Sequence, residues 1–163
     1  MDEFTLNEAL KLAVTTEQIG AKVYTRFARK FADHKEIAGV FSQLAKDERV
    51  HESQFQVLLD RNPRAAETAS QYGEDEYLRA TAISGFFKDE AFDNLEKIEK
   101  PKDALANAFA MERATLLFYQ AIRDRIGADT ALDEVIQAEK SHLTALMRVI
   151  LADADFRSLS DKW

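Results

Sequence analysis

The residues in this sequence that could do chemistry are glutamates and histidines that recur at one spacing. Glu48 and His51 lie three residues apart, and Glu139 and His142 repeat that spacing. Residues three apart on an α-helix lie on one face, about a turn from each other, so each pair could chelate one metal ion. The chain has three histidines, and two of them belong to these pairs. Chance placement of polar residues on a helix explains one such pair more easily than two.

Two further glutamates extend the pattern. Glu17 and Glu112 each interrupt a run of apolar residues at helical spacing, so both are expected to face a core. In an antiparallel helix hairpin, two residues at equal distances from the turn lie at one height. The midpoint of positions 17 and 48 is 32.5, and that of positions 112 and 139 is 125.5; both fall where we predict loops. The sequence therefore predicts that four carboxylates and two imidazoles meet at one level of a core.

Such a cluster needs positive charge, because leaving an ionised carboxylate unpaired in a core costs several kcal/mol. Two divalent cations would balance four carboxylates, and neutral imidazoles would complete the set of ligands. Oxygen and imidazole ligands suit iron, manganese or zinc, whereas calcium does not favour histidine and structural zinc sites usually use thiolates. The alternative is that these residues are satisfied polar groups of an ordinary core.

Four long amphipathic runs must position these residues. The first covers residues 5–32, and the second carries an apolar stripe from Ile37 to Leu58. The third runs from Leu105 to Ile126 and the fourth from Leu132 to Val149, with apolar residues three and four apart. We therefore predict an all-α fold, a four-helix bundle made of two antiparallel helix hairpins.

A long crossover, about residues 61–104, joins the two hairpins. Asn62 and Pro63 break the second helix, and Pro101 is a residue with which the third could begin. A short helix is expected within the crossover, from Glu74 to Ile83. A link of this length means that the second and third helices need not be antiparallel neighbours.

Two tyrosines and one aspartate are candidates for supporting the cluster from outside. Tyr24 and Tyr119 each follow a cluster glutamate by seven residues. Helical side chains lean toward the N-terminus, so we predict that each hydroxyl orients the glutamate of its own helix, two turns earlier. Asp47 precedes Glu48 and could support a histidine. The alternatives are ordinary core aromatic residues and an exposed aspartate, and we expect His34 to be solvated in a turn.

Length and composition favour one globular domain, residues 1–163, with 46% hydrophobic and 31% charged residues. Cysteine is absent, so neither disulfides nor thiolate sites are available. The net charge is −7 and no basic stripe is present, which argues against a nucleic-acid partner. The sequence shows neither a secretory signal nor an apolar run long enough to span a membrane, so we expect a cytoplasmic protein without membrane association.

The order Glu, E-x-x-H, crossover, Glu, E-x-x-H resembles the ferritin-like superfamily, and within it the rubrerythrin-like proteins. The resemblance spans about residues 5–153 and implies two iron ions per chain, with manganese or zinc possible. Rubrerythrin proper also has an iron–sulfur rubredoxin-type domain, which needs cysteine, and an extra glutamate near the third-helix ligand, where this chain has Phe109 and Thr115. Carried over position by position, the resemblance implies six metal ligands: Glu17, Glu48, His51, Glu112, Glu139 and His142.

Several functions agree with this resemblance. The first is an oxidoreductase whose di-metal centre is itself the catalytic group and reduces hydrogen peroxide or dioxygen, with a separate electron donor. The second is a ferroxidase or iron-storage protein that takes ferrous iron as its substrate. A structural bundle stapled by metal, or hydroxylation of a substrate, are further alternatives. Since rubrerythrin-like bundles often pair, we expect a homodimer.

Overall fold

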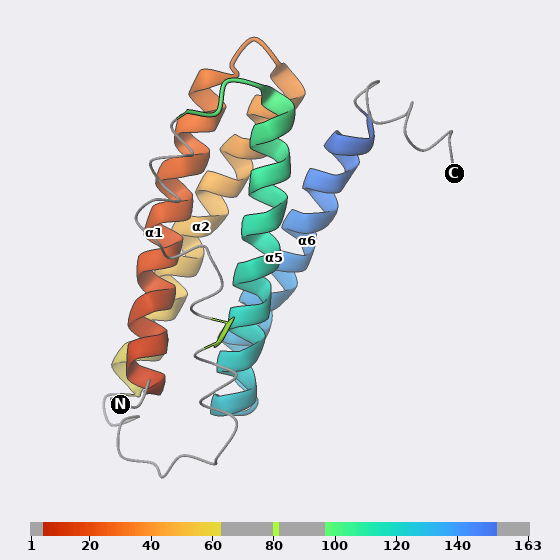
Figure 1. The fold of residues 1–163 in the computed structure, drawn as a ribbon. Coiled ribbons are helices and arrows are strands. Elements are labelled where there is room, and N and C mark those ends of the chain that lie inside the picture. The colour runs from red at the N-terminus through yellow and green to blue at the C-terminus, as the bar shows by residue number, and fades with distance from the viewer. Residues whose placement is uncertain (1–4, 63–79, 82–96, 153–163) are drawn as a thin grey trace.

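The computed structural model of this protein describes residues 5–62, 80–81 and 97–152. Four long helices, labelled in Figure 1, make up most of this part of the chain. No strand occurs within the three described ranges, so the predicted all-α class is confirmed. The helices are α1 (Leu6–Lys30), α2 (Lys35–Arg61), α5 (Pro101–Ile126) and α6 (Thr130–Ala152).

The helices pack as two hairpins side by side. α1 packs against α2 and α5 against α6, while α2 also contacts α6 and α1 also contacts α5. Figure 1 shows that α1 and α2 run in opposite directions, whereas α2 and α5 run in the same direction. Arg61 and Pro101 therefore lie at opposite ends of the bundle. This is the predicted bundle of two hairpins, with the second and third long helices not antiparallel to each other.

The helix ends follow from local chemistry. Thr5 and Glu8 form a capping box at the start of α1, in which the Glu8 backbone N–H donates to Thr5 Oγ1 (3.2 Å) and the Thr5 backbone N–H donates to Glu8 Oε2 (2.8 Å). Asn62 caps α2, and Gly127 ends α5 with a φ of 87°, a conformation that favours glycine. The predicted break of the second helix at Asn62 and the predicted end of the third run at Ile126 both agree with the structure.

Some predicted helix boundaries differ from those of the structure, and one predicted helix lies mostly outside the described residues. α5 begins at Pro101, because a proline is well suited to the first turn of a helix. The predicted crossover range of 61–104 therefore extends one turn too far. Of the short helix expected over residues 74–83, only residues 80–81 are described, and they are helical. The midpoint at 32.5 lies in the loop between α1 and α2, but the midpoint at 125.5 lies inside the last turn of α5.

The core consists of two apolar clusters separated by a buried polar layer. One cluster holds the first half of α1 and the second half of α2, with side chains such as Leu10 and Phe55. The other holds the second half of α1 and the first half of α2, with Phe27 and Phe41. Burial of apolar area in these clusters stabilises the bundle, at roughly 25 cal/mol per Å². The polar layer lies at the middle of all four helices.

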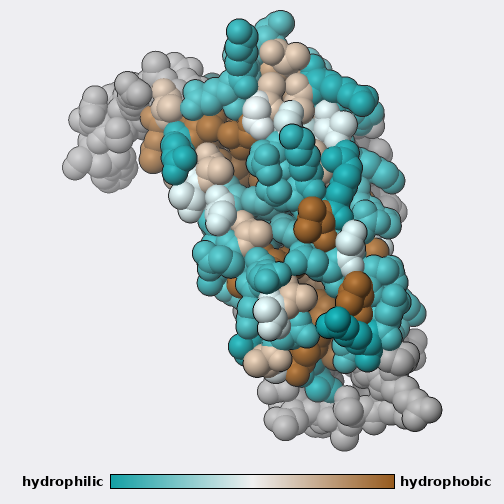
Figure 2. Space-filling model, turned by 180° about the vertical axis from the view of Figure 1, so that it is seen from behind, coloured by the Kyte–Doolittle hydropathy of each residue, from teal (hydrophilic) through white to brown (hydrophobic). Residues whose placement is uncertain are grey.

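The surface is mainly polar. Figure 2 shows hydrophilic side chains over most of one face, with hydrophobic ones between them. The large apolar side chains that are exposed among the described residues are Val50, Val57, Leu117 and Leu151. In the part of the chain that the structure describes, the helices are too polar to qualify as membrane spans.

Candidate metal centre

The polar layer contains all six residues predicted to bind metal. Each helix contributes: α1 one glutamate, α2 one glutamate and one histidine, α5 one glutamate, and α6 one glutamate and one histidine. None of the six is more than 5% exposed. The structure thus brings together residues separated by up to 125 positions in the sequence: Glu17, Glu48, His51, Glu112, Glu139 and His142.

The six residues form two groups that share members. Glu17 and His51 belong to one group, and Glu112 and His142 to the other, while Glu48 and Glu139 belong to both. Within each group, the potential ligand atoms lie within 4.8 Å of one another. Two neighbouring ligand sets that share two carboxylates are the arrangement that a carboxylate-bridged pair of metal ions requires.

Both histidines present Nδ1 to the carboxylates. His51 Nδ1 lies 3.1 Å from Glu139 Oε1 and 3.6 Å from Glu17 Oε2. His142 Nδ1 lies 3.0 Å from Glu112 Oε2 and 3.7 Å from Glu48 Oε1. Each imidazole therefore faces one glutamate of its own group and one shared glutamate.

Several atoms in this layer have no partner in hydrogen-bonding geometry, even where an oppositely charged atom is close, although buried polar atoms are normally paired. An imidazole nitrogen and three carboxylate oxygens are in this state. All four belong to the ligand group that contains Glu17 and His51, so one cation there would satisfy them at once, and the residues of this group fit a metal ion. The four atoms are Glu17 Oε2, Glu48 Oε1, His51 Nδ1 and Glu139 Oε1.

Without metal, the carboxylates and imidazoles perturb one another strongly. Burial, reinforced by neighbouring carboxylates, raises the pKa of Glu48 well above its ordinary value and that of Glu112 to about 8. Burial alone would lower the pKa of His51, but the Glu139 and Glu17 carboxylates raise it to about 9. Burial would likewise lower the pKa of His142, but the Glu112 and Glu139 carboxylates raise it to about 11. Protons thus occupy the metal-free cluster, and binding of cations would release them.

The two tyrosines hold the glutamate of the opposite hairpin. The Tyr24 hydroxyl donates to Glu112 Oε1, and the Tyr119 hydroxyl donates to Glu17 Oε1. Our prediction that each would contact the glutamate of its own helix is wrong. Seven residues correspond to a rise of about 10.5 Å, and the glutamate leans away in the same direction as the tyrosine. The neighbouring helix is closer, because α1 packs against α5.

Asp47 supports one histidine. Its Oδ2 lies 3.3 Å from Nε2 of His142, on the ring edge opposite the cluster. A carboxylate in this position fixes the tautomer and the orientation of a ligand imidazole. The corresponding position before Glu139 is Ala138, which has no carboxylate to offer His51. The two ligand groups therefore differ in their support.

Two residues that contact the shared glutamates were missed as site residues. Thr115 Oγ1 lies 3.2 Å from Glu139 Oε2. Gly20 packs directly against the Glu48 side chain. Both lie three residues after a cluster glutamate, Glu17 or Glu112, and that spacing was the available signal. In the sequence both residues continue the runs of small and apolar residues at helical spacing, so neither stands out as a site residue.

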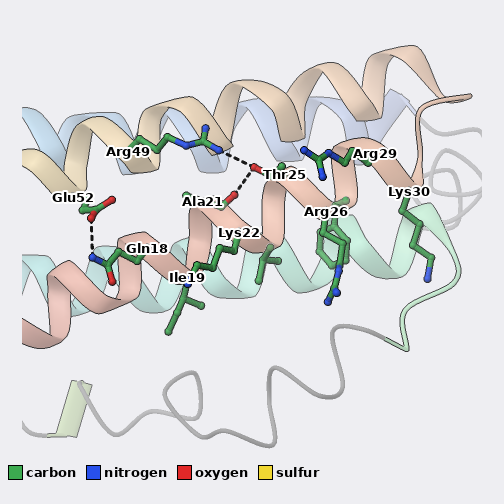
Figure 3. A pocket seen from close by; sticks show the side chains of 12 residues that line it. Gln18, Ile19, Ala21, Lys22, Thr25, Arg26, Arg29, Lys30, Arg49 and Glu52 are labelled. Atoms are coloured by element: carbon green, nitrogen blue, oxygen red, sulfur yellow. Dashed lines mark hydrogen bonds between the residues drawn. The ribbon is translucent and has the colours of Figure 1, made fainter.

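Two surface cavities lie near the layer. The larger, about 1110 Å³, follows the outer side of α1, where Gln18 donates to Glu52 (2.7 Å) and Arg49 to Thr25 (3.0 Å) (Figure 3). None of the six cluster residues lines it. A smaller pocket of about 340 Å³ between α2 and α6 reaches His142. A small molecule could approach the layer from outside at this histidine.

Comparison with known proteins agrees with this geometry. A family model described as Rubrerythrin matches residues 8–150, a range that contains all six cluster residues. No curated protein and no solved structure matched the chain.

Proposed function

Because the chain belongs to the rubrerythrin family, we propose that it is a di-iron oxidoreductase that reduces hydrogen peroxide or dioxygen. The observation that carries this proposal is the pair of ligand groups that share Glu48 and Glu139. A structural site for one ion would need only one of these groups. Two adjacent ions suit a reaction in which two electrons are transferred to one small molecule.

The charge of the cluster supports two divalent cations per chain. Four carboxylates carry four negative charges when ionised, and two such cations balance them with both imidazoles neutral. Oxygen and nitrogen ligands suit iron, with manganese or zinc as the other metals that this set could hold. When bound, a pair of ferrous ions supplies two electrons, which with two protons convert hydrogen peroxide to two water molecules.

The protein's own residues hold the ligands in place for this reaction. Tyr24 and Tyr119 fix the two unshared glutamates, and Asp47 fixes the His142 ring. The apolar clusters on either side exclude bulk water from the layer, which strengthens electrostatic interactions within it. The sequence contains no cysteine, so we propose that a separate electron donor restores the reduced state.

The alternative that the same residues support is a ferroxidase, for which ferrous iron is the substrate and is passed on after oxidation. One experiment distinguishes the two functions. The protein is loaded anaerobically with ferrous iron, the bound iron is counted, and portions are mixed with hydrogen peroxide or dioxygen in a stopped-flow instrument.

Two irons per chain that are oxidised faster by peroxide would support the proposed peroxidase activity. A faster reaction with dioxygen, followed by uptake beyond two irons, would favour ferroxidase and storage. If the bound metal responded to neither oxidant, the proposal would be wrong and a metal-stapled structural bundle would explain the site.

A further inference from the structure

Gly20 lies in the buried polar layer beside Glu48. It follows Glu17 by three residues, so it lies on the same face of α1. A methyl group on Gly20 would lie 2.8 Å from Oε2, 3.2 Å from Cδ and 3.4 Å from Cγ of Glu48. The Glu48 carboxylate therefore occupies the space that any other side chain at position 20 would fill.

The equivalent position on α5 is Thr115, which follows Glu112 by three residues. Its Oγ1 lies 3.2 Å from Oε2 of Glu139, the other shared glutamate, and 3.0 Å from the carbonyl oxygen of Glu112. The two shared carboxylates thus have different neighbours. Glu139 faces a hydroxyl group, whereas Glu48 faces a helix backbone without a side chain.

Glycine within a helix is unfavourable compared with alanine, because it loses more backbone freedom on folding. Gly20 is buried in the middle of a helix that runs from Leu6 to Lys30, and its φ is not positive, so no turn requires a glycine there. The local reason for glycine is the close approach of Glu48. A close approach of this kind is one of the uses of a residue without Cβ.

We propose that Gly20 is a positioning residue for the metal centre: it lets the Glu48 carboxylate lie against α1 at the place where both ligand groups can use it. This inference rests on the proposed two-metal function. Ligands must be held within about 0.5 Å of their productive positions. Since Glu48 belongs to both groups, displacing its carboxylate would disturb both metal positions at once.

The first test compares Gly20→Ala with Gly39→Ala. Gly39 is an exposed glycine of α2, and a methyl group there would meet nothing within 4 Å. The probe is zinc, which is redox-inert, titrated into metal-free protein against a competing chelator. We expect G20A to bind zinc about tenfold more weakly or worse, and G39A to bind within twofold of the wild type. Equal zinc affinity in wild type and G20A would overturn the proposal.

Thermal unfolding of the metal-free proteins gives a readout that does not depend on metal. An alanine within a helix normally raises the melting temperature, and G39A should show this. G20A should lower it, because the new methyl group forces Glu48 into the cluster. If G20A instead raised the melting temperature as G39A does, the close packing against Glu48 would not matter and the inference would fail.

A double-mutant cycle with Glu48→Asp tests whether Gly20 acts through Glu48. The shorter side chain draws the carboxylate back toward α2 and leaves room for a methyl group on α1. The melting-temperature loss caused by G20A should therefore be smaller in the E48D background than in the wild type. Equal losses in both backgrounds would contradict the proposed role.

The two proposals fail in different ways. If the wild-type protein binds neither zinc nor iron, the proposed function is wrong, and the melting temperatures and the cycle still decide whether Gly20 positions Glu48. If the wild type binds two zinc ions and G20A matches it in affinity and melting behaviour, the proposed function stands and this inference fails.

Discussion

Tyr24 of α1 donates a hydrogen bond to Glu112 of α5, and Tyr119 of α5 donates one to Glu17 of α1. Each hairpin thus holds the unshared glutamate of the other hairpin. Residues 62–100 connect the two hairpins along the chain, and these two contacts also join them through the core. Burial and the neighbouring carboxylates raise the pKa of both tyrosines well above the ordinary value of 10.0, which keeps each hydroxyl protonated as a donor.

Replacing either tyrosine with phenylalanine should therefore lower stability without removing the metal. Tyr24→Phe leaves Glu112 Oε1 without its donor, and Tyr119→Phe does the same to Glu17 Oε1. Leaving a buried acceptor without its donor costs about 1–3 kcal/mol. Chemical denaturation should show a loss of this size for each variant, while metal analysis should still find two ions per chain. Loss of one or both ions would mean that the tyrosines are required for binding.

Some features of the site can be predicted from residue spacing along the sequence, whereas others depend on how the helices pack. The six cluster residues were recognisable because ionisable groups in an otherwise apolar stripe are conspicuous, and Asn62, Pro101 and Gly127 mark helix ends by their backbone chemistry. The tyrosine contacts were assigned to the wrong helix. That choice depends on the distance between neighbouring helices, which one-dimensional spacing does not contain.

The same dependence on packing affects the assumption that two residues equidistant from the turn of a hairpin lie at one height. It placed the first midpoint in the loop after α1, but the second at position 125.5, inside α5. The assumption requires that both helices leave the loop at one height. Glu112 lies 14 residues before the end of α5 at Ile126, whereas Glu139 lies nine residues after the start of α6 at Thr130, so the two glutamates are not equidistant from this loop. The role of Gly20 could not be predicted from the sequence, because it depends on the position of Glu48, which lies on another helix and packs against this glycine.

Removing either cluster histidine should reduce metal binding. His51→Ala and His142→Ala each delete the one imidazole of a ligand group, so we expect the iron count to fall from two per chain toward one. Oxidation of the loaded protein by peroxide or dioxygen should slow with it. His34→Ala is the matched control, because His34 is exposed before α2 and its side chain makes no capping hydrogen bond. Two irons and full turnover in both cluster variants would refute the site assignment.

The support of His142 by Asp47 predicts that the two metal positions differ in affinity. Removing a carboxylate behind a ligand histidine typically weakens metal binding by about 10–100-fold. Asp47→Ala should therefore weaken one of two zinc-binding steps in a calorimetric titration and leave the other nearly unchanged. Asp60→Ala provides the control, since Asp60 lies on the same helix and its Oδ1 is paired with Gln56 (3.0 Å). An equal effect of D47A on both steps would contradict the proposed asymmetry.

Metal should stabilise the protein more as the pH rises. In the metal-free protein the pKa of Glu112 is raised from 4.5 to about 8, and that of His51 from 6.5 to about 9. Each folded group keeps its proton at a pH where the unfolded group has lost it, so stability declines between pH 4.5 and 8 for Glu112 and between 6.5 and 9 for His51. Below these windows the protons are bound in both states and the decline is absent.

Bound cations change this balance, because they take the place of the protons and favour the ionised carboxylates and neutral imidazoles. Thermal unfolding should therefore show a difference between zinc-loaded and chelator-treated protein that is small at pH 6 and grows toward pH 9. The H51A variant should lose part of the decline between pH 6.5 and 9 in its metal-free form, since it lacks one of the groups that titrate there. A metal-free protein whose melting temperature stayed constant from pH 6 to 9 would show that the cluster does not hold the protons described above.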